Sequence, residues 1–113
     1  MKIITETITI NELNQMASNT FGNMVKAVVD VDRETIAVDA ELHSDLEALL
    51  LGNGSKQKSL WGINLYPAVQ GDDFIEFDSL INMRPSQGNR SRGIESPQIR
   101  GKIIGITTKR IKR

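Results

Sequence analysis

The residues best suited to chemistry lie together in the polar stretch over residues 82–93, Asn-Met-Arg-Pro-Ser-Gln-Gly-Asn-Arg-Ser-Arg-Gly. Its three guanidinium groups can each bind phosphate or carboxylate through paired hydrogen bonds. Glycine lets backbone N–H groups approach an anion closely, and the Ser, Gln and Asn side chains supply further donors. We therefore predict an anion-binding loop. Its predicted ligand-binding residues are Arg84, Ser86, Gln87, Asn89, Arg90 and Arg92.

The same arginines have a competing, structural use. Residues 1–83 carry five basic and thirteen acidic side chains, a net charge of −8, whereas residues 84–113 carry nine and one, a net charge of +8. Carboxylates such as Glu76 and Asp78 can therefore pair with the loop arginines and hold the loop in place. A charge split also occurs in proteins that bind nucleic acid, so RNA is one form that the phosphate-containing ligand can take. A homodimer whose acidic and basic surfaces meet is a third use of the same charges.

His43 is the only histidine and the second candidate for chemistry. Glu47 follows four residues later, on the same face of a helix. Either residue can act as the base of a small ribonuclease or phosphoryl-transfer enzyme in which the loop arginines stabilise the transition state. The spacing also describes an ordinary surface ion pair, so no catalytic residue is assigned. Catalysis requires His43 to lie within reach of Arg84, and a binding module is the favoured function.

Carboxylates also gather around Asp30, Asp32, Asp39 and Glu41. Carboxylate oxygens are ligands for Mg²⁺ and Ca²⁺, but this spacing matches neither an EF-hand loop nor a metal-dependent nuclease. The chain has no cysteine, which excludes thiolate zinc sites and cysteine nucleophiles. We therefore predict no metal site and no cofactor.

Start and stop signals along the chain predict three helices. Thr9 and Glu12 form a capping box for the first helix, and Gly22 ends it. Leucines over residues 42–50 mark a short second helix. Ser96-Pro97 combines a favoured N-cap residue with proline at the first helical position, which predicts the start of a third.

Alternating apolar residues predict the strands. Residues 24–40 and 60–83 each indicate two strands joined by a turn, and residues 3–8 can add a further strand. Hairpins imply antiparallel pairing. The predicted fold is therefore α+β, an antiparallel sheet of four to five strands built from two hairpins, with about three helices on one face.

Length and composition are typical of a single domain over residues 1–113. Hydrophobic residues make up 39% and charged residues 25% of the chain, close to globular averages. No apolar run approaches the roughly 20 residues that span a bilayer, and the N-terminus becomes polar too soon for a signal peptide. We expect a cytoplasmic protein that does not contact membranes.

Three segments resemble a known family. They are residues 60–67 (Leu-Trp-Gly-Ile-Asn-Leu-Tyr-Pro), residues 74–91, which contain Arg-Pro-Ser-Gln-Gly-Asn-Arg, and residues 94–100 (Ile-Glu-Ser-Pro-Gln-Ile-Arg). Together they resemble a family of small bacterial proteins, frequent in cyanobacteria, that is classed as a domain of unknown function. The resemblance covers most of the chain. Because the family brings no established activity, ligand or catalytic residue, it implies no residue roles.

Overall fold

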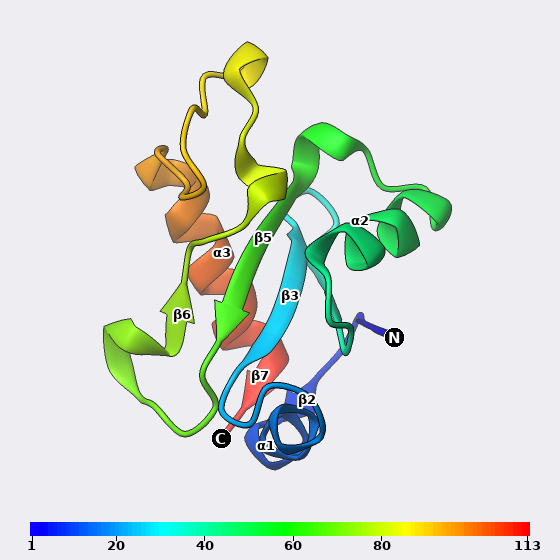
Figure 1. Ribbon diagram of the computed structural model, residues 1–113, viewed down its shortest axis with the longest axis vertical. Coiled ribbons are helices and arrows are strands. Elements are labelled where there is room, and N and C mark those ends of the chain that lie inside the picture. Colours follow the sequence, from blue (N-terminus) through cyan, green and yellow to red (C-terminus); the bar gives the residue numbers. More distant parts are fainter.

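The computed structural model describes all of residues 1–113, and its main element is a five-stranded antiparallel sheet (Figure 1). The strand order is β1-β4-β3-β5-β6. The strands are β1 (Lys2–Ile4), β3 (Val25–Asp30), β4 (Thr35–Val38), β5 (Leu60–Leu65) and β6 (Ile75–Glu76). The predicted α+β fold and the hairpin of β3 and β4 are confirmed.

A second, two-stranded sheet joins the two ends of the chain. In it β2 (Ile8–Thr9) pairs in parallel with β7 (Ile111–Lys112). The predicted strand over residues 3–8 therefore divides into β1 and β2, which belong to different sheets. The short pair brings the start of the first helix next to the end of the last one.

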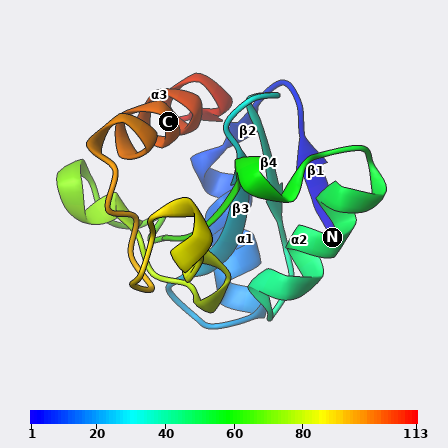
Figure 2. The same ribbon diagram turned by 90° about the horizontal axis from the view of Figure 1, so that it is seen from above.

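Three helices pack against the large sheet: α1 (Ile10–Asn19), α2 (His43–Gly52) and α3 (Pro97–Arg110). Figure 2 shows α2 and α3 on opposite sides of the sheet. None of the three is long and apolar enough to cross a lipid bilayer. The prediction that the helices cover one face was wrong.

Both faces of the sheet need a cover because both are apolar along β3. Val29 belongs to the larger core cluster, which also contains Leu13 of α1 and Ile103 of α3. Its neighbour Val28 points the other way, into the smaller cluster with Leu46 of α2. Adjacent side chains of a strand point to opposite faces, so consecutive valines produce two buried faces.

The helix starts follow the predicted capping signals. Thr9 Oγ1 accepts from Glu12 N at 3.1 Å, and Glu12 Oε1 accepts from Thr9 N at 3.3 Å. At α3, Ser96 Oγ accepts from Ile99 N at 3.2 Å, and Pro97 occupies the first turn. Both predictions are confirmed, and each cap contributes about 1 kcal/mol.

The second hairpin is present, but its returning strand is shorter than predicted. β6 pairs with β5 at only two positions, after which the chain leaves the sheet. A 3-10 turn over Leu80–Asn82 replaces the strand predicted to continue to residue 83. The fully buried Asn82 side chain makes the hydrogen bonds to β5 that a neighbouring strand backbone would make. Its Oδ1 accepts from Gly62 N at 2.8 Å, and its Nδ2 donates to Gly62 O at 2.9 Å.

Position 62 must be glycine for this arrangement. A Cβ atom there would lie 2.5 Å from Ser79 Cβ, closer than side-chain carbons approach one another. The missing side chain lets the 79–82 segment lie directly on β5. The base of the polar 82–93 stretch is therefore anchored to β5.

Candidate functional site: the loop over residues 84–93

The loop over residues 84–93 projects beyond the end of the sheet and is drawn in yellow in Figure 1. Its tip is a tight turn in which Arg84 N donates to Asn89 O at 2.7 Å and Asn89 N donates to Arg84 O at 3.1 Å. Between them lie a 3-10 turn over Pro85–Gln87 and Gly88, whose φ of 82° falls in the left-handed region that favours glycine. The backbone of the tip is thereby closed on itself.

Asn89 holds the rest of the loop together from inside, with only 4% of its surface exposed. Its Nδ2 lies 2.7 Å from Asn82 O, 2.8 Å from Gly93 O and 3.1 Å from Ser91 O. Its Oδ1 accepts from Glu95 N at 2.9 Å. The structure therefore places this predicted ligand donor at the centre of the loop, with its amide shared among backbone groups.

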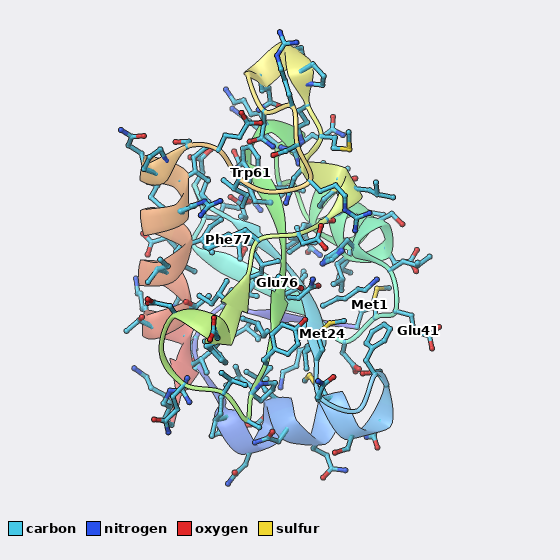
Figure 3. The ribbon with its side chains drawn as sticks, turned by 60° about the vertical axis from the view of Figure 1, so that its left-hand side comes forward. Met1, Met24, Glu41, Trp61, Glu76 and Phe77 are labelled. Carbon is cyan, nitrogen blue, oxygen red and sulfur yellow. The ribbon has the colours of Figure 1, made fainter.

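Arg84 ties the loop to the sheet and to α2. Its guanidinium lies 4.8 Å from the centre of the Trp61 ring, its Nε donates to Ile81 O at 3.0 Å, and its Nη2 donates to Leu60 O. Nη2 also lies 3.8 Å from Glu47 Oε2. Figure 3 shows Trp61 close to the base of the loop. The side chain is only 9% exposed, so Arg84 is positioned to fix the loop's base.

Burial lowers the pKa of Arg84, and the facing carboxylate of Glu47 opposes that change. Because the pKa of arginine is ordinarily far above neutral, Arg84 remains charged at pH 7. No hydrogen bond completes the ion pair, because Arg84 Nη1 and Glu47 Oε2 are both buried without a hydrogen-bond partner. Arg84 and Glu47 therefore interact through their charges at 3.8 Å and not through a hydrogen bond.

The other two loop arginine residues also meet carboxylates. Arg92 Nε donates to Asp78 Oδ1 at 2.7 Å, as the structural alternative predicted. Glu95 Oε2 accepts from the backbone N–H groups of Arg90 at 2.6 Å and Ser91 at 3.1 Å. The N–H of Arg90 is the largest of the causes that hold the pKa of Glu95 below its usual range. Thus the backbone donors at positions 90 and 91 already bind an internal anion.

The sequence patterns did not lead us to predict Glu95 as a partner of the loop. It could have been predicted, because it is the one acidic residue among the basic residues after position 83. Glu76, in contrast, was predicted as a partner of the arginines. The structure places its Oε1 against Asn64 Nδ2 at 2.8 Å and Tyr66 Oη at 3.0 Å instead.

The side chains of Ser86, Gln87 and Arg90 are exposed at the loop surface. Gln87 Nε2 lies 3.4 Å from Lys58 O, which places the tip beside the 3-10 turn Gln57–Ser59. Neither Arg90 nor Lys58 takes part in any of the four ion pairs of the protein. Ser86, Gln87 and Arg90 of the loop, with Lys58 of the neighbouring turn, are therefore the exposed groups that a ligand can meet here.

A family model described as "Protein of unknown function (DUF5674)" matches residues 2–110. The chain belongs to this family. The predicted membership of a family of unknown function is confirmed, whereas a bacterial, cyanobacteria-rich distribution stays a prediction. No curated protein and no solved structure matches the chain. The function of this DUF5674 protein must therefore be argued from its geometry.

In this DUF5674 protein His43 is buried at the start of α2, and its Nε2 lies 2.8 Å from Ile63 O. A carbonyl oxygen accepts but cannot donate, so Nε2 carries the proton and donates it. Glu47 faces Arg84, and no ion pair joins it to His43. The two catalytic candidates therefore have separate partners, one on β5 and one in the loop.

The acidic residues around the first hairpin serve the DUF5674 fold in a similar way. Asp30 Oδ1 accepts from the backbone N–H groups of Asp32 and Arg33 at 2.9 Å each, and its Oδ2 accepts from Ser55 Oγ at 2.6 Å. Asp32 accepts from Ser59 Oγ. No group of three or more His, Asp or Glu side chains is placed to hold a metal ion.

The stability of the protein should depend on the titration of His43. Burial is the main cause that lowers its pKa below the ordinary value of 6.5, so the unfolded chain binds a proton more readily than the folded one. The stabilisation is fully present above pH 6.5 and should be lost as the pH falls toward the folded pKa. Chemical denaturation from pH 7.5 to 5.5 measures this loss.

His43→Gln supplies the control, because it removes the only side chain with an ordinary pKa in that range. The variant should unfold with a free energy that is nearly constant between pH 7.5 and 5.5. The single imidazole signal in an NMR titration reports the folded pKa directly. A folded value at or above 6.5 contradicts the prediction.

Proposed function

We propose that this protein is a binding module whose 84–93 loop holds a phosphate-bearing or carboxylate ligand, with RNA phosphates as one ligand of this class. The observation that carries the proposal is the presence of exposed cations, Arg90 and Lys58, that make no ion pair and lie around a rigid turn. Ser86 and Gln87 on the same turn add uncharged donors.

The construction of the loop supports this role. Arg84 and Asn89 are buried and form the frame, so the loop should lose little conformational freedom when a ligand binds, and that favours affinity. Arg92 has a double use: its Nε is bound to Asp78, while its side chain is 53% exposed. Asp78 therefore orients a guanidinium whose other N–H groups can reach an anion.

The proposal predicts that phosphate compounds raise the melting temperature of the wild-type protein. Three probes separate the ligand classes: inorganic phosphate, citrate, and a uridine 12-mer of RNA. Replacing Arg90 or Lys58 with alanine removes one contact each. Either change should weaken RNA binding by about three- to tenfold. It should also reduce the magnitude of the slope of log K against log salt concentration by about one. Isothermal titration at several salt concentrations measures both quantities.

Lys112→Ala is the matched control, because Lys112 is exposed, makes no ion pair and lies on β7 at the opposite end of the molecule. It removes the same charge and should leave binding unchanged. Equal weakening by Lys112→Ala would show general attraction to a basic surface and not a site. The proposal also fails if none of the three probes raises the melting temperature of the wild-type protein.

A further inference from the structure

A groove runs between the edge of the large sheet and α3. It consists of two adjoining hollows of about 400 and about 260 Å³, which share Gly71, Ile75 and Ile104 in their walls. Ile104 is 49% exposed although it lies in the middle of α3. The floor of the groove is therefore apolar surface that the fold leaves open.

The sheet side of the groove is a free strand edge. β6 is the last strand of the sheet and has a neighbour on one side only. Tyr66 N donates to Phe74 O at 2.9 Å, and Glu76 lies opposite Asn64 of β5. Successive residues of an antiparallel strand direct their backbone groups to alternate sides. The N–H and C=O of Ile75 consequently point away from β5 and can pair with another strand.

Two stacked arginines lie along the groove. Arg100 lies 4.9 Å above the Phe77 ring in the larger hollow, and Arg113 lies 4.7 Å above the Phe74 ring at the smaller one. Figure 3 shows Phe77 on the side of β6 that faces α3. Neither arginine takes part in an ion pair. Stacking on an aromatic ring holds a guanidinium in place while leaving edge N–H groups free for a carboxylate. In Arg100 the Nε already donates to Ile94 O.

The two hollows differ in charge. Asp72 lines the larger one together with Arg100, so the two charges there offset each other. The smaller hollow is lined by no acidic side chain, and the guanidinium of Arg113 is its one charged side chain, beside Thr107 and Thr108. An apolar side chain fits the larger hollow, and an acidic side chain fits the smaller one.

We propose that an extended acidic peptide segment adds to the β6 edge and fills this groove. Its backbone pairs with Ile75, which continues the sheet by one strand. Side chains two positions apart lie on the same face, about 6.8 Å from each other. An apolar side chain of the segment then packs on Ile104, and an acidic side chain two positions away binds Arg113.

A displayed library of random octapeptides, selected on the full-length protein, tests this inference. We expect enrichment of peptides in which an acidic residue lies two positions from an apolar one. For a labelled enriched peptide, Arg113→Glu and Ile104→Asp should each weaken binding at least tenfold in fluorescence anisotropy. Methylation of the peptide backbone nitrogen that faces Ile75 should do the same, because it removes the strand pairing.

The control variants change the charge of a basic residue outside the groove. Lys112→Glu reverses a charge next to Arg113 and should retain binding, as should Arg90→Ala in the separate loop. Circular dichroism melting checks that each variant is folded, and both substituted groove side chains are exposed.

Three results of the peptide experiments overturn the inference. They are peptide enrichment on the wild-type protein no greater than on Arg113→Glu, enrichment of basic peptides, and equal affinity of the peptide for wild-type protein and Ile104→Asp. A fourth contradicting result can come from sedimentation velocity. A dimer of the wild-type protein that Ile104→Asp dissociates would show that a second copy of the chain occupies the groove.

Discussion

Replacing Asn82 with alanine should lower the free energy of unfolding by about 3–5 kcal/mol, because it leaves two buried backbone groups without partners at about 1–3 kcal/mol each. The groups are Gly62 N and Gly62 O, which the Asn82 amide binds at 2.8 and 2.9 Å. A third group, Arg92 O, loses its 3.0 Å hydrogen bond from Asn82 but keeps the one from Ser79 N. Asn82 is fully buried, so water does not replace the lost hydrogen bonds.

Urea denaturation measures the loss, and Asn14→Ala on the exposed surface of α1 is the matched control, expected to change stability by less than about 0.5 kcal/mol. Asn82→Asp sharpens the test. It keeps an acceptor for Gly62 N but turns a carboxylate oxygen toward the carbonyl groups of Gly62 and Arg92, so it should also be strongly destabilising. A cost below about 1 kcal/mol for both substitutions would contradict the role assigned to Asn82.

Asn82 also shows where sequence patterns stop being informative. The alternation over residues 73–83 predicted a strand, and the pairing with β5 at Glu76 follows that pattern. Whether the chain continues as a strand or turns away depends on a side chain that binds a residue 20 positions earlier. Local signals such as the Thr9 and Ser96 caps were predictable because donor and acceptor lie three residues apart.

In the candidate site, too, local features were predictable from the sequence and distant contacts were not. Residue types and glycine content predicted a loop that binds an anion, and this stays a prediction. The structure shows the competing internal carboxylates: Glu47 beside Arg84, Asp78 beside Arg92, and Glu95 on the backbone N–H of Arg90. Composition carries no sign of which polar side chains face inward. Arg84 and Asn89 form the frame, whereas Ser86, Gln87 and Arg90 face solvent. Separating the two groups required the distant partners of Arg84, Leu60 on β5 and Glu47 on α2.

Arg84→Ala should also be strongly destabilising, with an expected cost of about 2–4 kcal/mol. Breaking a buried ion pair costs about 3–5 kcal/mol, and we place the value lower because the Glu47 side chain is 15% exposed and can regain some water. The carbonyl oxygens of Leu60 and Ile81 also lose their donor. Denaturation in urea measures the cost.

Trp61 supplies an independent signal for the same variant, since it is the one tryptophan in the chain and is only 3% exposed. Arg84 covers its ring at 4.8 Å. Without that cover the indole should meet water, so the emission maximum of folded Arg84→Ala should move to longer wavelength. Unchanged emission together with unchanged stability would show that Arg84 does not hold the base of the loop.

A double substitution separates the contribution of the Arg84–Glu47 ion pair to stability from that of the packing of Arg84 on Trp61. Arg84→Met keeps a flexible apolar side chain over Trp61 but leaves the Glu47 charge without a partner. Adding Glu47→Gln removes that charge, so the double variant should recover about 1–2 kcal/mol relative to the sum of the two single costs. Strict additivity would show that the contact at 3.8 Å contributes nothing.

The same series tests the distinction between frame and ligand contact. Arg84→Ala should weaken anion binding only together with a loss of stability, because it loosens the loop that presents the donors. Arg90 is exposed and makes no ion pair, so Arg90→Ala should weaken binding while the free energy of unfolding stays within about 0.5 kcal/mol of the wild-type value. If Arg90→Ala instead destabilises the protein as much as Arg84→Ala, the exposed arginine belongs to the frame, and the loop has no free cation of its own for a ligand.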